Sequence, residues 1–389
     1  MRQPGRHFVQ IPGPTNVPDA VLRATARPTM DHRSAEFGEF GKKILERIKT
    51  VFKCAGPVFI YPASGTGAWQ AAMVNTLSPG DKVLMYETGQ FSNLWKAMAD
   101  SIGVVPELIT GDWRTGVDLK VMEERLAKDK GHEIKAVCIV HNETATGCRS
   151  SVPGMRKVLD GLKHPALLMV DAVSALGSMD YRHDEWGVDV GVSGSQKGMM
   201  LPPGLSFTAV SAKALEAAKT AKLGKGFWSW DDQIPLNAQG FFPYTPAVNL
   251  LYGLDVALDL LDAEGLDNVF ARHERHAEAT RRAVRAWGLE IQCRKEEDYS
   301  SSVTTVRMPE GHSGDAFRRV VAEKFNMSLG SGLAQLADKV FRIGHIGDLN
   351  DLMLAGALSG VEMGLTVGGV PHKEGGVQAA LDYLKVQNN

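Results

Sequence analysis

The sequence has few of the features that mark secreted, membrane or nucleic-acid-binding proteins. Cysteine is scarce, with 4 in 389 residues at positions 54, 138, 148 and 293 and no CxxC spacing. Neither a zinc knuckle nor a disulfide framework is therefore indicated, and we expect reduced thiols. Charge of one sign is not in excess either, since 43 Lys and Arg oppose 45 Asp and Glu for a net charge of −2. We expect neither a nucleic-acid nor a membrane partner.

Long hydrophobic runs are also missing. The first sixteen residues, MRQPGRHFVQIPGPTN, contain no apolar core of the kind found in a signal peptide. The most apolar late stretch, Leu352 to Val370, includes Glu362 and five glycines, which predicts a buried helix rather than a membrane span. With 44% hydrophobic and 23% charged residues, the composition is typical of a globular protein, and we expect a cytoplasmic location.

Short apolar runs alternate with amphipathic stretches between about residues 58 and 210. This alternation favours a mostly parallel sheet with helices on its faces, and runs of Val, Ile, Leu and Met without polar alternation are typical of strands buried on both faces. The amphipathic stretches at 68–77, 91–102, 121–128 and 155–162 predict the helices. Seven strands are predicted, at 58–61, 82–87, 104–110, 134–140, 166–170, 188–193 and 205–210.

The rhythm changes after about residue 250. A long helical region is followed by a strand, a helix, a second strand and two more helices, at 250–287 with a break near Gly265, then 302–308, 315–325, 340–343, 349–365 and 377–386. We predict an α/β protein with a large domain at 21–254. A smaller α+β domain is expected at 255–389, joined by residues 1–20.

Polar side chains just after strands deserve examination, because open parallel sheets bind ligands at the carboxyl ends of their strands. The segment Ser64 to Gly67 follows the strand at 58–61 and opens a helix, so its glycines and free N–H groups suit a phosphate. Gln70 stands where a dinucleotide fingerprint has its third glycine, and an ordinary capped turn is the alternative. Asp171 follows the strand at 166–170 and can be a helix cap, a metal ligand or the partner of a buried cation.

Two cations also lie in unusual surroundings. Lys197 follows the strand at 188–193 and precedes the apolar, proline-containing segment Met199 to Pro203. Apolar neighbours would lower its pKa and make the amine a usable nucleophile, whereas a solvated loop lysine is the alternative. Arg342 lies within an apolar strand, where its planar guanidinium matches either a structural or a substrate carboxylate. A phosphate-binding turn, a carboxylate, a desolvated lysine and such an arginine are what pyridoxal 5′-phosphate (PLP) chemistry on amino acids requires.

The chain resembles a known family in five segments that occur in this order: SGTGAWQAA, HNETATG, LLMVDAVSALGS, SGSQKGMMLPPG and VFRIGHIGD. They are similar to the class V aminotransferases, in particular the alanine–, serine– and aspartate–glyoxylate aminotransferases, and the resemblance runs from residue 11 into the C-terminal domain. It implies the PLP-dependent transferase fold of type I and a homodimer with shared active sites. It also implies ping-pong transfer of the amino group of serine, aspartate or alanine to glyoxylate, giving glycine.

The resemblance also assigns residues. Lys197 matches the lysine that binds the cofactor as a Schiff base and moves the proton at the substrate Cα. Asp171 matches the partner of the pyridine nitrogen, and Arg342 matches the arginine that binds the substrate carboxylate. Thr245 would reach the phosphate from the neighbouring subunit, and Phe242 lies where some relatives have Tyr. The cofactor-binding positions implied are Thr66, Gly67, Ala68, Phe91, Thr144, Asp171, Val173, Gln196, Lys197 and Thr245.

Three other functions fit the sequence less well. A cysteine desulfurase typically has His before its lysine, where this chain has Gln196, and Cys293 in the strand-like segment 289–293 is more simply a buried residue. A nicotinamide-dependent dehydrogenase is disfavoured because this chain lacks the third glycine of the dinucleotide fingerprint. A non-catalytic scaffold is disfavoured because all four groups required for PLP chemistry are present. Serine and aspartate stay equally supported as donors. Arg33 or Lys225 would admit aspartate by meeting its second carboxylate, with an ion pair or a solvated charge as the alternative.

Overall fold

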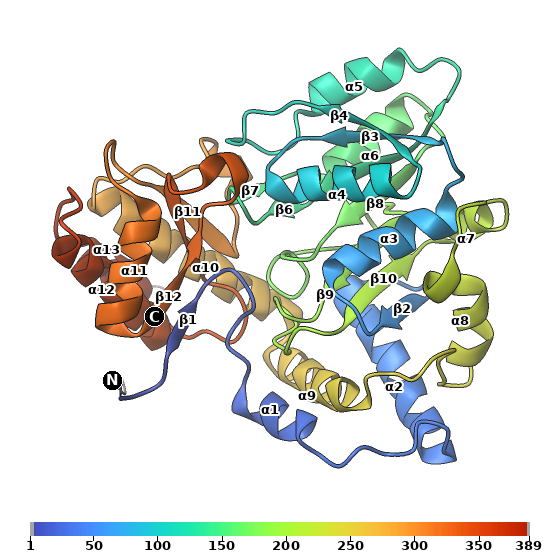
Figure 1. The fold of residues 1–389 in the computed structure, drawn as a ribbon, viewed down its shortest axis with the longest axis horizontal. Helices are drawn as coiled ribbons and strands as arrows, with labels where there is room; N and C mark the ends of the chain where they lie inside the picture. Colours follow the sequence, from blue (N-terminus) through green and yellow to red (C-terminus); the bar gives the residue numbers. More distant parts are fainter. Residues whose placement is uncertain (1–3, 387–389) are drawn as a thin grey trace.

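The computed structural model describes residues 4–386 and contains a large three-layered unit and a smaller sheet-and-helix unit (Figure 1). The large sheet has the order β2-β10-β9-β8-β5-β3-β4, and only β10 runs antiparallel to its neighbours. All seven predicted strands are present within two residues of the expected bounds. They are β2 (Val58–Tyr61), β3 (Lys82–Tyr86), β4 (Val105–Ile109), β5 (Ile134–Val140), β8 (Leu167–Asp171), β9 (Val190–Gly194) and β10 (Ser206–Val210).

Helices cover both faces of this sheet because its strands are apolar on both sides. In β2, for example, Phe59 and Tyr61 face one core while Val58 and Ile60 face the other. One core packs under α3 (Gly65–Thr76), α4 (Gln90–Ser101), α7 (Ala212–Ala218) and α8 (Trp230–Asn237). The opposite core packs under α1 (Asp19–Thr25), α2 (Ala35–Phe52), α5 (Leu119–Ala127), α6 (Val152–Gly161) and α9 (Val248–Glu264).

The smaller unit is built on a four-stranded sheet of order β1-β12-β13-β11. Its outer strand β1 comes from the N-terminal segment and runs parallel to β12, so residues 8–10 lie beside the C-terminal part of the chain (Figure 1). A two-stranded hairpin, β6 (Asn142–Glu143) and β7 (Cys148–Arg149), lies between the units. The remaining elements are β1 (Phe8–Gln10), β11 (Val303–Arg307), β12 (Met327–Ser331), β13 (Val340–Gly344), α10 (Leu266–Ala286), α11 (Gly314–Phe325), α12 (Asp351–Val367) and α13 (Gly376–Val386).

Some details differ from the sequence prediction. The segment 289–293 is not a strand, since it makes only an isolated bridge between Ile291 and Val306. The expected domain boundary at residue 254 falls inside α9, and the division into two domains stays a prediction. The apolar stretch 352–370 forms a helix and its exit, as expected, but only one face of the helix is buried, and Leu352, Met363 and Val367 are exposed. All four cysteines are free and buried. Within residues 4–386, no helix is long and apolar enough to cross a membrane.

Candidate active site

A cavity of about 330 Å³ lies at the carboxyl ends of the parallel strands, where an open α/β sheet binds its ligands. Four strands bring polar residues to it: β2 leads to Thr66, β5 to Thr144, β8 ends at Asp171, and β9 leads to Lys197. The cavity is lined by Gly13, Pro14, Ser64, Gly65, Thr66, Trp69, Phe91, Asn142, Thr144, Asp171, Val173, Gln196, Lys197 and Pro203. Seven of the residues assigned from the sequence therefore share one cavity.

Lys197 is buried, as the apolar segment after it led us to expect. Its Nζ donates a hydrogen bond of 2.6 Å to the carbonyl of Pro12. Burial lowers the pKa of Lys197 to about 7, the charge of Arg342 lowers it further, and Asp171 opposes both. Gly13 has a positive φ of +127°, and a Cβ there would lie 2.5 Å from Lys197 Cδ, so only glycine permits this close approach. The amine is thus partly neutral near pH 7 and held by the N-terminal segment.

Asp171 ends β8 with its carboxylate fixed by two donors. Trp69 Nε1 donates to Oδ2 at 2.9 Å, and the backbone N–H of Val173 donates to Oδ1 at 2.7 Å. Burial raises the pKa of Asp171 to about 6, while these two donors and Lys197 act in the opposite direction. The side chain is therefore neither a helix cap nor part of the metal-ligand cluster found elsewhere in residues 4–386. It is an oriented carboxylate facing the same cavity as Lys197.

The start of α3 lines the cavity with Gly65 and Thr66 and suits an anion. The first N–H groups of a helix have no intrahelical acceptor, and the helix dipole adds positive potential at this end. Gly65 is packed closely, because a Cβ there would lie 2.6 Å from Val173 Cγ2. Nearby, the buried Oε1 of Gln196 has no hydrogen-bond partner within residues 4–386. The side-chain amide of Gln196 therefore has a polar atom free to bind a ligand here.

Arg342 connects the small sheet to the cavity wall. Its Nη1 donates to the carbonyl of Thr144 at 2.9 Å, and its Nε donates to the carbonyl of Ser331 at 2.7 Å. Burial lowers the pKa of Arg342 to about 10, and Glu143 partly offsets this effect. Thr144 in turn donates from Oγ1 to Ser174 Oγ at 2.7 Å. The guanidinium is thus held in place by backbone carbonyls, and the Thr144 side chain by a serine hydroxyl.

Several residues of this site were not predicted from the sequence. Buried Glu143 accepts hydrogen bonds from the backbone N–H groups of Phe91, Ser92 and Ala145, which fixes the start of α4 against the β6–β7 hairpin. Burial raises the pKa of Glu143 to about 7, and these donors oppose that rise. Trp69 was also missed, because an indole in an apolar helix is usually a core residue. Asn142, Gly13 and Pro14 are further cavity residues that carried no separate signal.

Four assigned residues do not line the cavity. Gly67 packs against Trp228, since a Cβ there would lie 2.7 Å from its Cη2, and Ala68 points into the core under α3. Thr245 is exposed, and Arg342 lies behind Thr144. Their expected contacts with cofactor or substrate stay predictions.

Comparisons with known proteins show the family to which the chain belongs. The family model for class-V aminotransferases matches residues 11–346. The serine–glyoxylate aminotransferase of Hyphomicrobium methylovorum is 53% identical over 96% of this chain and 93% of its own. The L-aspartate–glyoxylate aminotransferase of Paracoccus denitrificans is 47% identical over 96% and 95%. The pyridoxamine–pyruvate aminotransferase structure from Mesorhizobium loti superposes with a TM-score of 0.91 at 26% identity, covering all of both chains. The chain therefore belongs to the class-V aminotransferases, whose cofactor is pyridoxal 5′-phosphate.

Proposed function

We propose that this aminotransferase transfers the amino group of serine to glyoxylate, giving glycine and the keto acid of serine, with Lys197 as the catalytic lysine. The observation that carries the proposal is the position of Lys197 Nζ, which is buried in the cavity that also contains Asp171 and the start of α3. The relative with 53% identity is named as a serine–glyoxylate aminotransferase, which supports this pair of substrates.

The residues present fit PLP group by group. The phosphate suits the free N–H groups at the start of α3, with Thr66 and the unpartnered amide of Gln196 beside them. The pyridine nitrogen suits the oriented carboxylate of Asp171. Phe91 and Val173 offer apolar contacts to the two faces of the ring, and Thr144 a hydroxyl to its 3′-oxygen. When bound, the cofactor supplies the electron-withdrawing ring that makes loss of the substrate Cα proton feasible.

The residues of this chain then have separate tasks. Lys197 attaches the cofactor and, once its amine is released, takes and returns the proton at the substrate Cα; a pKa near 7 permits both directions. Asp171 holds a negative charge at the ring nitrogen and so keeps that nitrogen protonated. Arg342 would bind the substrate carboxylate from its position behind Thr144, where two backbone carbonyls hold its guanidinium.

Serine is preferred over aspartate because of the charges around the cavity. Among the cavity-lining residues that the structure describes, Lys197 is the one cation, so the same chain offers no further cavity-lining cation to a second substrate carboxylate. Lys225 is already paired with Asp231 at 2.7 Å, and Arg33 is exposed at the surface. Aspartate stays a second candidate because of the Paracoccus denitrificans relative, with Arg33 as the cation to test.

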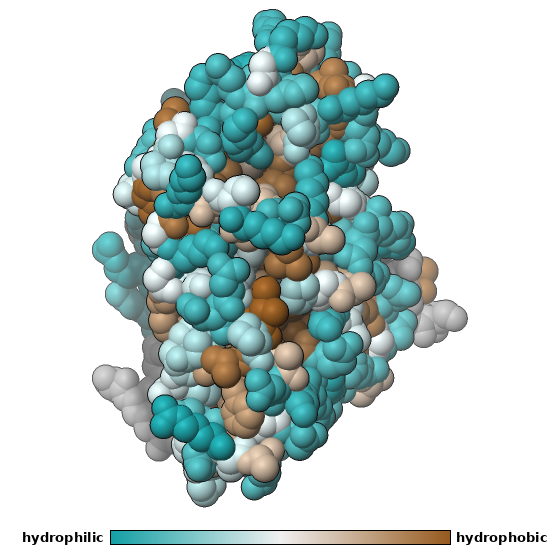
Figure 2. Space-filling view, turned by 90° about the vertical axis from the view of Figure 1, so that its right-hand side faces the viewer, coloured by the Kyte–Doolittle hydropathy of each residue, from teal (hydrophilic) through white to brown (hydrophobic). Residues whose placement is uncertain are grey.

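A cytoplasmic homodimer is part of the proposal. The face at the α7 and α8 end shows apolar side chains in a hollowed strip between polar ones (Figure 2). A cavity of about 600 Å³ on the large unit is lined in part by Leu215 and Ile234, and Ile234 and Phe227 are 43% and 46% exposed. Exposed apolar patches of this kind favour burial against another chain. Thr245, exposed in the single chain, would then contact the phosphate of the partner subunit's cofactor.

The proposal is tested by the visible absorbance of the purified protein with its cofactor. We expect serine to bleach the band of the bound cofactor and glyoxylate to restore it, with aspartate and alanine acting more slowly. Bleaching by aspartate alone would replace serine as the donor. In that case Arg33→Ala should lower the ratio of aspartate to serine turnover, whereas an unchanged ratio would remove Arg33 from the site. A protein that stays colourless with added PLP would contradict the assignment of Lys197.

Removing the indole N–H that holds Asp171 should weaken cofactor binding. Trp69→Phe keeps a buried aromatic ring but loses the hydrogen bond to Asp171 Oδ2. A hydrogen bond to a charged group contributes about 1.5–3 kcal/mol, so we expect the Kd for PLP to rise about tenfold or more. The measurement is an absorbance titration of the apoenzyme.

Trp95→Phe is the matched control for this change. Trp95 is equally buried and stacks on Trp69 at 5.8 Å, but its Nε1 has no hydrogen-bond partner within residues 4–386. It therefore loses an aromatic contact without losing a donor to Asp171. Equal losses in the two variants would show that Trp69 acts through packing alone.

A further inference from the structure

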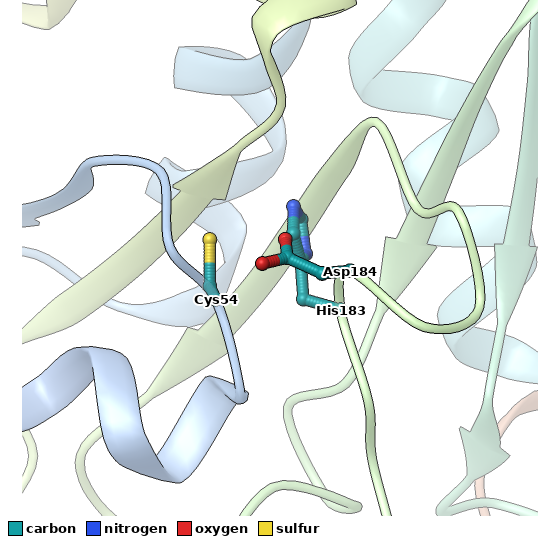
Figure 3. A group of neighbouring side chains, drawn as sticks. All are labelled: Cys54, His183 and Asp184. Atoms are coloured by element: carbon teal, nitrogen blue, oxygen red, sulfur yellow. The ribbon is translucent and has the colours of Figure 1, made fainter.

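Three potential metal ligands meet at the end of the large sheet that is remote from the cavity. Cys54 lies between α2 and β2, and His183 and Asp184 lie in the loop between β8 and β9. Figure 3 shows the three side chains converging from these two segments. One ligand atom from each lies within 4.8 Å of the other two. β2 and β9 begin near this cluster and end near the cavity, so the cluster and Lys197 lie at opposite ends of the same strands.

Three hydrogen bonds join the two segments, two between backbone groups and one from a backbone N–H to a carboxylate. His183 N–H donates to the carbonyl of Phe52 at 3.0 Å, and Asp184 N–H donates to the carbonyl of Lys53 at 3.4 Å. The N–H of Ala55 donates to Asp184 Oδ2 at 2.7 Å. The ligand atoms are therefore brought together by the fold itself, and little backbone ordering is left for an ion to impose.

His183 has a buried nitrogen that nothing in the described chain satisfies. Its Nδ1 lies 3.2 Å from Tyr181 Oη, whereas its Nε2 has no hydrogen-bond partner within residues 4–386. A buried polar atom without a partner is costly, and each such atom needs a physical reason. Histidines that bind metals commonly use their second nitrogen for a hydrogen bond, a role that Tyr181 can take here.

The other two groups complement this imidazole. Cys54 is buried and Asp184 is exposed, so the cluster is protected on one side and open to solvent on the other. A cation bound here would displace the proton of the Cys54 thiol, because the thiolate is the form that binds a metal.

We propose that Cys54, His183 and Asp184 form a binding site for Zn²⁺ with an open fourth position for water. Thiolate, imidazole and carboxylate together are a ligand set of zinc, and soft sulfur ligation disfavours Mg²⁺ and Ca²⁺. The cluster lies at the opposite end of the strands from the cavity, and an ion bound there would tie the start of β2 to the loop before β9. This inference is independent of the substrates proposed above.

The test is a titration of the chelator-treated, PLP-loaded enzyme with Co²⁺, which takes zinc sites and has visible bands. We expect one equivalent per chain to give tetrahedral d–d bands and a sulfur-to-cobalt charge-transfer band, both removed by Zn²⁺. In Cys54→Ala the charge-transfer band should vanish and Zn²⁺ affinity should fall by about 100-fold or more, since even residues that only support ligands contribute 10–100-fold. Cys293→Ala is the matched control, because Cys293 is also a free, buried cysteine and neighbours Cys148 elsewhere in the fold.

Asp184→Asn provides a second variant at an exposed position, which should fold even if Cys54→Ala does not. It should bind Zn²⁺ about tenfold more weakly and lose most of the rise in Tm that Zn²⁺ gives the parent enzyme. Transamination should stay unchanged in both variants. The proposal is overturned if the parent enzyme gives no stoichiometric cobalt spectrum, or if the sulfur-to-cobalt band survives in Cys54→Ala.

Discussion

Lys197→Ala is expected to keep PLP noncovalently and to lose transamination. The phosphate and ring contacts do not depend on the lysine, so the cofactor should still bind, although more weakly. The proton at the substrate Cα would have no positioned base, and general acid–base catalysis alone contributes about 10²–10⁴-fold. We therefore expect kcat to fall by at least that factor. Steady-state rates with serine and glyoxylate, and the absorbance of the variant after desalting, measure the two effects.

Covalent attachment can be tested separately from turnover. Borohydride treatment of the parent enzyme should fix the cofactor to the peptide that contains Lys197, as read by mass spectrometry, and should fix none to Lys197→Ala. Lys213→Ala is a suitable control, because Lys213 also lies after a strand of the large sheet but binds the carbonyl of Ala166 and Asp189 at the surface. Labelling at another lysine, or full activity of Lys197→Ala, would contradict the assignment.

Asp171→Asn is the second change with a large expected effect. Asparagine keeps the size of the side chain, and its carbonyl oxygen can still accept from Val173 N–H or Trp69 Nε1. It loses the negative charge that would keep the pyridine nitrogen protonated. Removing one charge-stabilising group from an active site typically lowers kcat by about 10²–10³-fold, and we expect a loss of this size together with weaker PLP binding. Kinetics at saturating PLP separate the two.

The alternative for Asp171 is a purely structural role. A structural carboxylate would lower stability or cofactor occupancy but leave turnover per bound cofactor intact. Rates should therefore be divided by the PLP content of each preparation, measured after alkaline release. An undiminished rate per bound cofactor in Asp171→Asn would remove Asp171 from the catalytic site.

The sequence predicted most of the large sheet because its signals are local. Strands buried on both faces must be apolar throughout, so runs such as 134–140 and 166–170 stand out without knowledge of their neighbours. Helix α2 was overlooked because the predicted elements began only at residue 58, although Ser34 caps its start and Phe37, Ile44, Ile48 and Phe52 follow with helical spacing. Strand β12 is short and contains Gly330, so its apolar content was too low to separate it from a loop.

Part of the candidate site was predicted from the topology of the parallel sheet. Residues at the carboxyl ends of parallel strands lie at the same edge of the sheet, regardless of which elements connect the strands. Thr66, Asp171 and Lys197 could therefore be expected to share a cleft. The resemblance to class V aminotransferases added Phe91, Thr144, Val173 and Gln196. These residues lie within or directly after elements that the sequence itself predicts.

The sequence alone determined the α/β class, the buried strands and the set of chemical groups, because apolar runs and residue types are properties of neighbouring positions. Only the tertiary structure decided which donors reach those groups. Trp69 contacts Asp171 across 102 positions, and Lys197 contacts Pro12 across 185. The unpartnered nitrogen of His183 beside Cys54 likewise exists only in the folded chain. A hydrogen bond requires placement to within a few tenths of an ångström, and that precision comes from the packing of whole elements rather than from any local pattern.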